Sequence, residues 1–343
     1  MRGSCSKLRP PYRELLSPLM HDVPLGFSGV AGVLAPERVS LAELATRGLL
    51  LSTPDTLASL GFSHAHLADA EHDAGWLAQT AARAALRDAA LEPGAIDVLI
   101  WASALPENHI HPVPMDANVA PIDALLAKFN YGASWLQDTL GLDRATLIGN
   151  AQQGCSGMFS ALRTARALLI AEPRVQHVLC VGVDVLPPGA PREILYNVIS
   201  DAASAVVVSR GATRDRWVGY HQVSKGYYWN VPEKQKEIIA SYFPTSRFVI
   251  TQLLAQTGLK ATDLDWIIPT GVGADSWRIL AQLLGLSPDK IYQGAQSFGH
   301  TVAADNFLHL AELRALGRIP AGQRLLLFTY GFGSSWCGLI LEH

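Results

Sequence analysis

Hydrophobic and polar positions along the chain follow two alternating periods. Short apolar runs of strand length are separated by segments in which apolar residues recur with the 3.6-residue spacing of amphipathic helices. The clearest runs are VLIWASA (98–104), VLCVGVDVL (178–186), WIIPTGV (266–272) and LLLFTYGFG (325–333), and the clearest helical segments are 156–173 and 301–320. Strands that alternate with helices in this way predict an α/β protein with a mostly parallel or mixed sheet in each half.

An internal duplication organises these elements. The stretch ALEPGAIDVLI (90–100) aligns without a gap with GLKATDLDWII (258–268), which pairs Asp97 with Asp265. This repeat predicts two halves, residues 1–210 and 211–343, that are fused through a shared core. Residues 212–247 show no clear counterpart in the first half, and we interpret them as an elaboration around a substrate entrance.

Cys155 and His300 occupy nearly equivalent places in the two copies. LGLDRATLIGNAQQGC (140–155) resembles LGLSPDKIYQGAQSFGH (284–300), and each stretch leads into one of the two helical segments. If the halves pack about a pseudo-twofold axis, the starts of these helices converge and the thiol faces the imidazole. The positive end of a helix favours a thiolate, so Cys155 is a candidate nucleophile. The alternative is that Cys155 is a small buried hydrophobic residue.

The composition narrows the classes of partner. With 343 residues, 49% of them hydrophobic, the chain can bury a large core, and its net charge of −3 indicates no nucleic-acid partner. The apolar runs are too short to span a bilayer, and the first residues lack the apolar segment of a signal peptide, so we expect a cytoplasmic protein without membrane contact. The cysteine spacing favours neither a metal site nor a disulfide, and we interpret His109 and His111 as solvated loop residues. We expect no cofactor.

The order of several motifs resembles that of the thiolase superfamily, especially its ketoacyl-ACP synthase III (KAS III)-like proteins. NAQQGCSGMFSALRTARALL (150–169) resembles the nucleophile segment of that family. Further segments resemble the family in the same order: SDAASAVVVSR (200–210), DWIIPTGVGADSWRILAQLLGL (265–286), SFGHTVAADNF (297–307) and LLLFTYGFGSSWCGLIL (325–341). The resemblance covers residues from about 75 to 343. It implies an α/β, thiolase-like fold in which duplicated βαβ halves form a five-layered αβαβα sandwich.

The resemblance also implies where this chain departs from the condensing members of the family. In those proteins a cysteine acts with a His and an Asn that stabilise an enolate, but Thr270 stands at the position of the His and His300 at that of the Asn. A threonine hydroxyl cannot replace the charge or the acid–base function of an imidazole. The remaining Cys155–His300 pair is sufficient for acyl transfer.

Some KAS III-like proteins of secondary metabolism are acyltransferases with a Cys-His-Asp triad. Asp305, five residues after His300, is the nearest candidate for the carboxylate, although it can also be interpreted as a helix N-terminal carboxylate that complements the dipole. The resemblance implies an oxyanion hole formed by the backbone N–H groups of Cys155 and Phe332. We therefore assign Cys155, His300, Asp305 and Thr270 to the candidate catalytic site.

The predicted function is an acyltransferase. It would take an acyl group from an acyl-carrier-protein or CoA donor onto Cys155 and pass it to the hydroxyl or amine of a small-molecule acceptor, in a polyketide-type secondary-metabolite pathway. Residues 52–72 do not match the basic segment that helps to bind CoA in the family, which favours a carrier-protein donor. Two alternatives are a decarboxylative condensing β-ketoacyl synthase with a rearranged site and a silent partner subunit of a ketosynthase pair.

The resemblance further implies a homodimer. Relatives pair through a sheet edge of the N-terminal half, and an unpaired apolar edge strand would otherwise promote aggregation. The apolar run VLCVGVDVL (178–186) is the strand that we expect at this edge.

Overall fold

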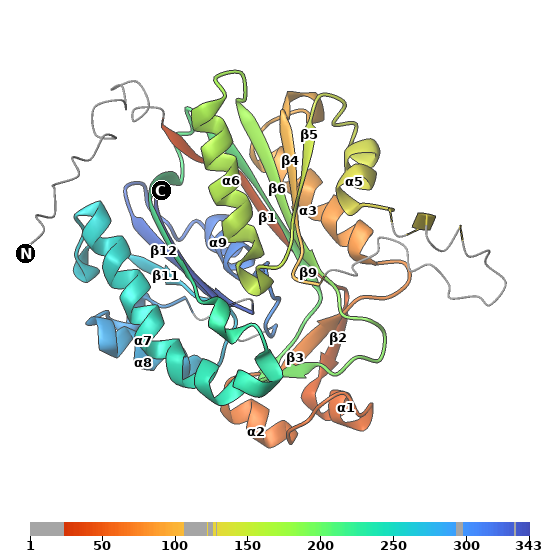
Figure 1. Cartoon of the computed structure of the whole chain (residues 1–343), viewed down its shortest axis with the longest axis vertical. Coiled ribbons are helices and arrows are strands. Elements are labelled where there is room, and N and C mark those ends of the chain that lie inside the picture. The colour runs from red at the N-terminus through yellow and green to blue at the C-terminus, as the bar shows by residue number, and fades with distance from the viewer. Residues whose placement is uncertain (1–23, 106–121, 123–125, 128, 293–297, 333) are drawn as a thin grey trace, which may run out of the picture.

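The computed structural model describes residues 24–105, 122, 126–127, 129–292, 298–332 and 334–343 (Figure 1). Within these residues the first half of the chain supplies five strands to a central sheet: β1 (Leu25–Leu34), β4 (Val98–Ala102), β5 (Thr146–Asn150), β6 (His177–Asp184) and β9 (Ala202–Arg210). The second half supplies four: β10 (Arg216–Ser224), β11 (Trp266–Ile268), β12 (Arg324–Gly331) and β13 (Ser335–Glu342). The apolar runs of the sequence are thereby confirmed as strands.

The two halves of the sheet have the same strand order. The first half reads β1-β9-β6-β4-β5, and the second reads β10-β13-β12-β11, with Ile291 bridging to Ile267 of β11 at the position that β5 occupies in the first half. Within the described residues β1 and β10 are joined by one antiparallel pair, Gly26 with Arg216. The half-sheet that the sequence predicted for each half is therefore present, and the two half-sheets are joined at this one pair.

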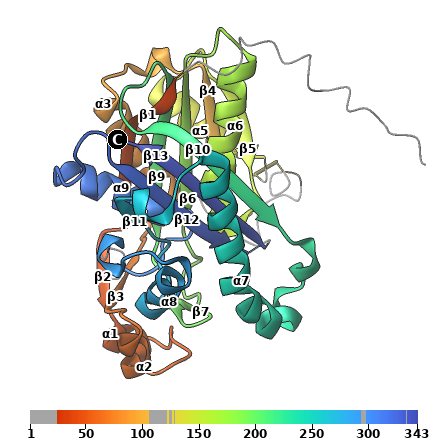
Figure 2. The same cartoon turned by 90° about the vertical axis from the view of Figure 1, so that its left-hand side faces the viewer.

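Helices cover both half-sheets and fill the space between them (Figures 1 and 2). The helices that follow equivalent strands of the two halves are α3 (Ala74–Asp88) and α7 (Val231–Thr257), α5 (Gly132–Leu140) and α8 (Ala274–Leu284), and α6 (Gly157–Ala171) and α9 (Asp305–Ala315). Helices α6 and α9 share one buried cluster with strands of both halves, α3 and α5 pack on the first half, and α7 and α8 pack on the second. These layers are the predicted αβαβα sandwich.

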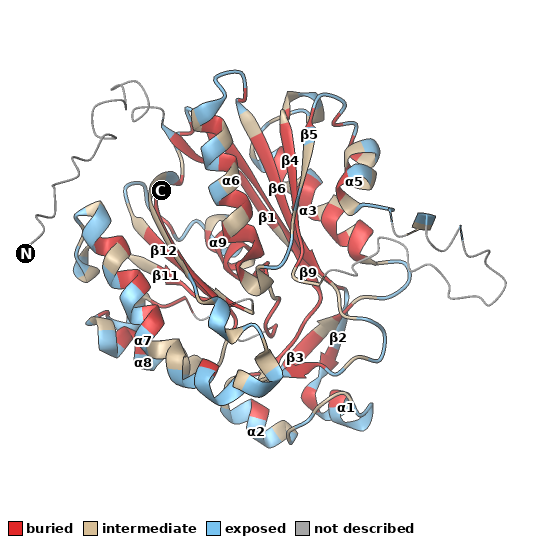
Figure 3. Ribbon diagram, in the orientation of Figure 1, coloured by how far each residue is buried: buried red, intermediate tan, exposed pale blue. Residues whose placement is uncertain are grey.

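Buried residues lie mainly along the strands and along α6 and α9, whereas the outer helices also have exposed faces (Figure 3). Sandwiched elements of this kind are apolar on more than one side, which explains the nearly continuous apolar runs of the central strands. A smaller cluster forms outside the sandwich. It is built by α1 (Leu41–Thr46), α2 (Pro54–Ser59) and the pair β2 (Glu37–Ser40) and β3 (His64–Leu67), and a second short pair is β7 (Glu193–Ile194) with β8 (Asn197–Val198).

The aligned aspartates have the same structural role in both halves. The carboxylate of Asp97 accepts hydrogen bonds from the backbone N–H groups of Gln176 and His177, at the start of β6 (2.8 and 3.1 Å). The carboxylate of Asp265 accepts one from the N–H of Arg324, at the start of β12 (2.8 Å). Each aspartate thus ties the strand that it precedes to the next parallel strand. The division of the chain into two domains at residue 210 stays a prediction.

Two sequence-based expectations were wrong. Residues 212–247 are no elaboration, because they form β10 and much of α7, which take the places of β1 and α3 in the second half. The strand VLCVGVDVL is not at the sheet edge, because β6 lies between β4 and β9 and pairs with both. The strand at that edge is β5. Among the described residues, none of the helices combines the length and apolar character needed to cross a bilayer.

Candidate active site

Cys155 lies in a tight turn directly before α6. Residues Gly154–Ser156 form a 3₁₀ turn, and the hydroxyl of Ser156 donates to the carbonyl oxygen of Gln153 (2.6 Å). The backbone φ of Gly154 is +50°, and a Cβ there would lie 2.4 Å from the carbonyl oxygen of Phe332. Only glycine satisfies both the left-handed backbone and the close approach of a second chain segment. The apolar face of α6 anchors this turn in the core, while Cys155 remains half-buried.

His300 lies in the loop that precedes α9. Its backbone pairs with the neighbouring segment as a strand residue would. The N–H of His300 donates to the carbonyl of Val198 (2.7 Å), and the carbonyl of His300 accepts from the N–H of Ser200 (2.9 Å). The ring is buried, with 7% of the residue exposed. Its Nε2 lies 3.2 Å from the Sγ of Cys155, so the structure brings the thiol and the imidazole within hydrogen-bonding distance.

Asp305 is fully buried behind the imidazole. Its Oδ2 accepts a 2.5 Å hydrogen bond from Nδ1 of His300, together with hydrogen bonds from the hydroxyl of Thr270 (2.8 Å) and the N–H of Gly271 (2.6 Å). Its Oδ1 accepts from the N–H and the hydroxyl of Thr301 (2.6 and 2.7 Å). Five donors therefore hold the carboxylate against the imidazole. Asp305 is also the first residue of α9, so both interpretations of this residue describe real features.

The charges of this cluster shift the pKa values of its members. Burial by itself lowers the pKa of His300, but the charges of Asp305 and Cys155 and the hydrogen bonds to them outweigh it and hold the pKa well above its ordinary 6.5. Burial by itself raises the pKa of Asp305, but the charge of His300 and the hydrogen bonds from His300, Gly271 and Thr301 lower it far below 3.8. The pair is therefore stable as imidazolium and carboxylate at neutral pH.

Cys155 differs in environment from the other described cysteines. Cys180 and Cys337 are buried, and burial raises the pKa of both thiols, which makes them inert as nucleophiles. Cys155 alone of these three is half-buried and lies beside an imidazole. A reactive thiol requires partial exposure and a base nearby, and the role of Cys155 as nucleophile stays a prediction.

The remaining predicted site residue is Phe332, in the turn between β12 and β13. A Cβ on Gly154 would lie 2.6 Å from the amide nitrogen of Phe332, and one on Gly331 would lie 2.7 Å from the amide nitrogen of Cys155. The backbones of the two turns are thus in direct contact. This proximity is compatible with the two N–H donors that an oxyanion hole requires, whose role stays a prediction.

Sequence reasoning missed the residues that support the cluster. Gly271 and Thr301 hold Asp305, and Thr270 proves to be a donor to the same carboxylate. The side chain of Gln153 accepts from Gln222 of β10 (3.3 Å) and Ser335 of β13 (3.2 Å), which ties the nucleophile turn to two strands of the second half. The spacing of these polar residues gives no signal, because their partners lie far away in the sequence.

Left-handed backbone occurs in each of the three segments that meet at the site. Gln152, Val302 and Ser334 have φ values of 64°, 56° and 58°. Such conformations cost about 1–3 kcal/mol for residues other than glycine, and for a β-branched residue they are rare. Strain of this kind is typical of functional sites, where surrounding structure fixes the geometry. In the described part of the chain, no cluster of three or more His, Cys, Asp or Glu side chains could hold a metal ion, and His109 and His111 lie outside it.

Comparisons with known proteins show similarity to one family. Residues 150–226 match the family described as 3-oxoacyl-[acyl-carrier-protein (ACP)] synthase III, and residues 254–343 match its C-terminal family. The β-ketoacyl-[acyl-carrier-protein] synthase III of Methylococcus capsulatus is 26% identical over 339 residues, which cover 92% of this chain and 98% of the relative. The corresponding protein of Neisseria meningitidis is 27% identical over 342 residues, with the same coverage.

Solved structures share the fold. The 3-oxoacyl-[acyl-carrier-protein] synthase III of Aquifex aeolicus superposes with a TM-score of 0.78 at 20% identity, covering 93% of this chain and all of that one. OleA of Xanthomonas campestris superposes with a TM-score of 0.77 at 19% identity over 93% and 99% of the two chains. ChlB3, described as an acyltransferase, gives 0.78 at 19% identity over 93% and 97%.

These matches and the duplicated sandwich define a thiolase-fold enzyme of the acyl-transferring or condensing class. Within that class, the chain is similar to the KAS III-like proteins of the thiolase superfamily, in both matched regions and along most of its length.

Proposed function

We propose that the protein is an acyltransferase that carries the acyl group on Cys155. The observation that supports this best is the chain of contacts Cys155–His300–Asp305, with 3.2 and 2.5 Å between successive side chains. Nucleophilic catalysis by a thiol requires a base within hydrogen-bond distance and a group that orients the base. Both are present, and the description of ChlB3 as an acyltransferase agrees with the proposal.

In the first half-reaction, Cys155 is acylated. The proton of the Cys155 thiol resides on His300, and the sulfur, as thiolate, attacks the carbonyl carbon of the donor thioester. The negative charge that develops on the carbonyl oxygen would be stabilised by the backbone N–H groups of Cys155 and Phe332. The intermediate collapses when the bond to the donor sulfur breaks, and the proton held by His300 passes to the departing thiolate. Proton transfer of this kind requires Nε2 to face the reaction, and Asp305 fixes that orientation by binding Nδ1.

In the second half-reaction, the acyl group passes to a hydroxyl or amine. His300 removes a proton from the acceptor, whose oxygen or nitrogen attacks the thioester on Cys155. When the bond to sulfur breaks, the proton taken from the acceptor stays on His300, and the thiolate beside protonated His300 restores the starting state. The donor would be an acyl carrier protein or an acyl-CoA, the acceptor a small molecule of a secondary-metabolite pathway, and the active species a homodimer in the cytoplasm.

The position of Thr270 disfavours decarboxylative condensation. Its hydroxyl is fully buried and donates to Asp305, so it is engaged where a condensing enzyme would offer a free donor to the substrate carbonyl. Thr270 is therefore better described as a positioning residue than as a catalytic one. His300 alone would have to bind the carbonyl of a malonyl group in the condensing alternative. Release of carbon dioxide from a malonyl thioester, dependent on His300, would support that alternative.

Intact-protein mass spectrometry tests the proposal. The purified protein is incubated with acetyl-, malonyl- and longer acyl-CoA thioesters and with the same groups on an acyl carrier protein. We expect a mass increase of one acyl group on the wild-type protein and none on Cys155→Ala. His300→Ala should form the adduct at least about 100-fold more slowly, because the proton acceptor is lost.

Two results would contradict the proposal. The first is an adduct that persists on Cys155→Ala, since the acyl group would then reside elsewhere. The second is the absence of any adduct on the wild-type protein with every donor, which would favour the silent-subunit alternative. Cys180→Ala is the matched control, because it removes a fully buried thiol on β6 and should leave the adduct unchanged.

A further inference from the structure

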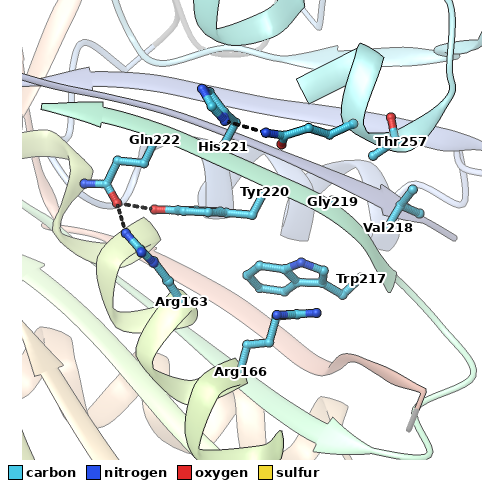
Figure 4. A pocket seen from close by; sticks show the side chains of 10 residues that line it. Arg163, Arg166, Trp217, Val218, Gly219, Tyr220, His221, Gln222 and Thr257 are labelled. Atoms are coloured by element: carbon cyan, nitrogen blue, oxygen red, sulfur yellow. Dashed lines mark hydrogen bonds between the residues drawn. The ribbon is translucent and has the colours of Figure 1, made fainter. Parts of the chain in front are cut away.

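A cleft of about 450 Å³ lies between α6 and β10 (Figure 4). Its walls are Arg163 and Arg166 of α6, residues of β10 from Trp217 to Gln222, and the end of α7. The candidate active site does not use these residues to contact substrate. The cleft is therefore a separate feature of the molecule.

The cleft exists because one edge of β10 is not covered. Strand β10 pairs with β13 along its whole length, but its other edge pairs with β1 only at Arg216. Beyond that residue, no strand in the described ranges continues the sheet on this side. The edge of the strand thus forms the floor of the cleft, and the flanking helices form its sides.

The charged groups in the cleft are all cations. The guanidinium of Arg166 lies over the indole of Trp217 at 5.7 Å, and that of Arg163 lies over the ring of Tyr220 at 5.9 Å. Arg163 also makes a long contact to the side-chain oxygen of Gln222 (3.4 Å). No Asp or Glu lines the cleft, and in the described part of the chain neither arginine forms an ion pair.

These cations are held in position without a counter-charge. Each guanidinium lies over an aromatic ring, and Figure 4 shows both side chains directed toward β10. Burial lowers the pKa of Arg166, which means that the surroundings disfavour its charge. His221 also borders the cleft, and its Nε2 is buried without a hydrogen-bond partner. A bound anion would bring negative charge to both guanidinium groups and an acceptor to the buried nitrogen of His221.

We propose that this cleft is a binding site for a small phosphate-bearing anion. Two guanidinium groups three residues apart on one helix face match a group with two or more negative charges, as a phosphate or diphosphate ester carries. The aromatic rings beside them provide an apolar surface for the remainder of such a ligand. None of Cys155, His300 and Asp305 lines the cleft, and the one link between the two sites is Gln222 at its edge, which also binds Gln153 beside the nucleophile.

Isothermal titration calorimetry with inorganic pyrophosphate tests this site on the full-length protein. We expect one site with a dissociation constant below about 1 mM at low ionic strength, weakened as salt is added. The double variant R163Q/R166Q should bind at least about 10-fold more weakly, because both charge-assisted contacts are lost. Both residues are exposed enough for the substitution to leave the fold intact, which circular dichroism verifies.

The matched control is R83Q/R87Q, which removes the same net charge from two exposed arginines on α3. It should bind pyrophosphate as the wild-type protein does. Equal weakening in both double variants would overturn the proposal, because the effect would then come from net charge alone. Absence of heat for the wild-type protein up to about 10 mM pyrophosphate would overturn it as well.

Discussion

Replacing Asp305 with asparagine tests how the carboxylate controls the site. The carboxylate accepts five hydrogen bonds, two from Thr301 on Oδ1 and three from His300, Thr270 and Gly271 on Oδ2. Asparagine has one oxygen and one NH2 group in place of the two carboxylate oxygens. Whichever way the side chain is oriented, its NH2 group therefore faces hydrogen-bond donors that lose their acceptor. Each buried donor that loses its acceptor costs about 1–3 kcal/mol, and we expect the free energy of unfolding to fall by at least about 2 kcal/mol.

The same substitution should slow acyl transfer by about 10²–10⁴-fold, because His300 loses its fixed orientation and the charge that stabilises its protonated form. Since the charge of Asp305 raises the pKa of His300, its removal lowers that pKa. Transfer from acylated Cys155 requires neutral imidazole, so its rate rises with pH through the pKa of His300. In Asp305→Asn this rise should occur at lower pH, toward a lower plateau.

The pH dependence of stability follows from the same pair. The raised pKa of His300 contributes stability that is fully present below 6.5 and is lost as pH rises through the folded-state value. The lowered pKa of Asp305 contributes stability present above 3.8 and lost as pH falls below it. Urea unfolding between pH 3 and 9 measures both limbs, and Asp305→Asn should flatten them.

The matched control is Asp184→Asn, which alters another buried carboxylate. Asp184 accepts hydrogen bonds from the N–H groups of Ala104 (2.7 Å) and of Ala303, near α9 (3.2 Å). It should leave the pH profile of transfer in place. A wild-type rate and pH profile in Asp305→Asn would refute the reasoning, because the carboxylate would then have no influence on the base.

Three further substitutions give independent tests. Gly154→Ala should abolish acylation and lower the free energy of unfolding by more than about 3 kcal/mol, because the added Cβ meets the backbone of Phe332. Gly211→Ala, also at positive φ but in open space, should lower it by only about 1–2 kcal/mol, as measured by urea unfolding, and equal losses in the two variants would contradict the account. Burial raises the pKa of Asp184 to about 7, so the wild-type protein loses stability as pH rises from 4 to 7. Over that range the free energy of unfolding of Asp184→Asn should rise by up to about 4 kcal/mol relative to the wild-type protein, and a difference that stays constant with pH would argue against this. Thr270→Val removes one hydrogen bond to Asp305 and should slow acyl transfer by no more than about 10-fold, and Thr270→Ser should restore the rate. A decrease in rate as large as that of His300→Ala would mean that Thr270 contacts the substrate.

The duplication carried most of the fold prediction. The apolar runs and their helices recur in both halves, and the paired Asp97 and Asp265 mark the same junction between neighbouring parallel strands. The place of β10 and α7 was not predictable, because their sequences share no pattern with β1 and α3 although the positions are equivalent. Position in the sheet also decided the wrong assignment of β6 to an edge. Strand β6 is apolar because it is buried on both faces, and this is typical of an interior strand and not of an edge strand.

The sequence allowed prediction of the three residues of the contact chain but not of the residues that hold Asp305 in place. Cys155 and His300 follow from equivalent positions in the repeat, and Asp305 follows from its nearness to His300 in sequence. The roles of Thr270, Gly271 and Thr301 depend on which loops meet around one carboxylate, and a single sequence does not contain that information. Gln222 is similar, since it binds Gln153 across 69 positions of sequence.

The most direct test of the central proposal is single-turnover transfer from the acylated enzyme. Wild-type protein, loaded with an acetyl group on Cys155 and freed of donor, is mixed with hydroxylamine as a general amine acceptor, and loss of the adduct is followed by mass spectrometry. We predict that the wild-type protein transfers the group at least about 100-fold faster than His300→Ala, with a rate that rises through the pKa of His300. Equal rates in the two proteins would contradict the account, because the imidazole beside the thiol would then take no part in the reaction.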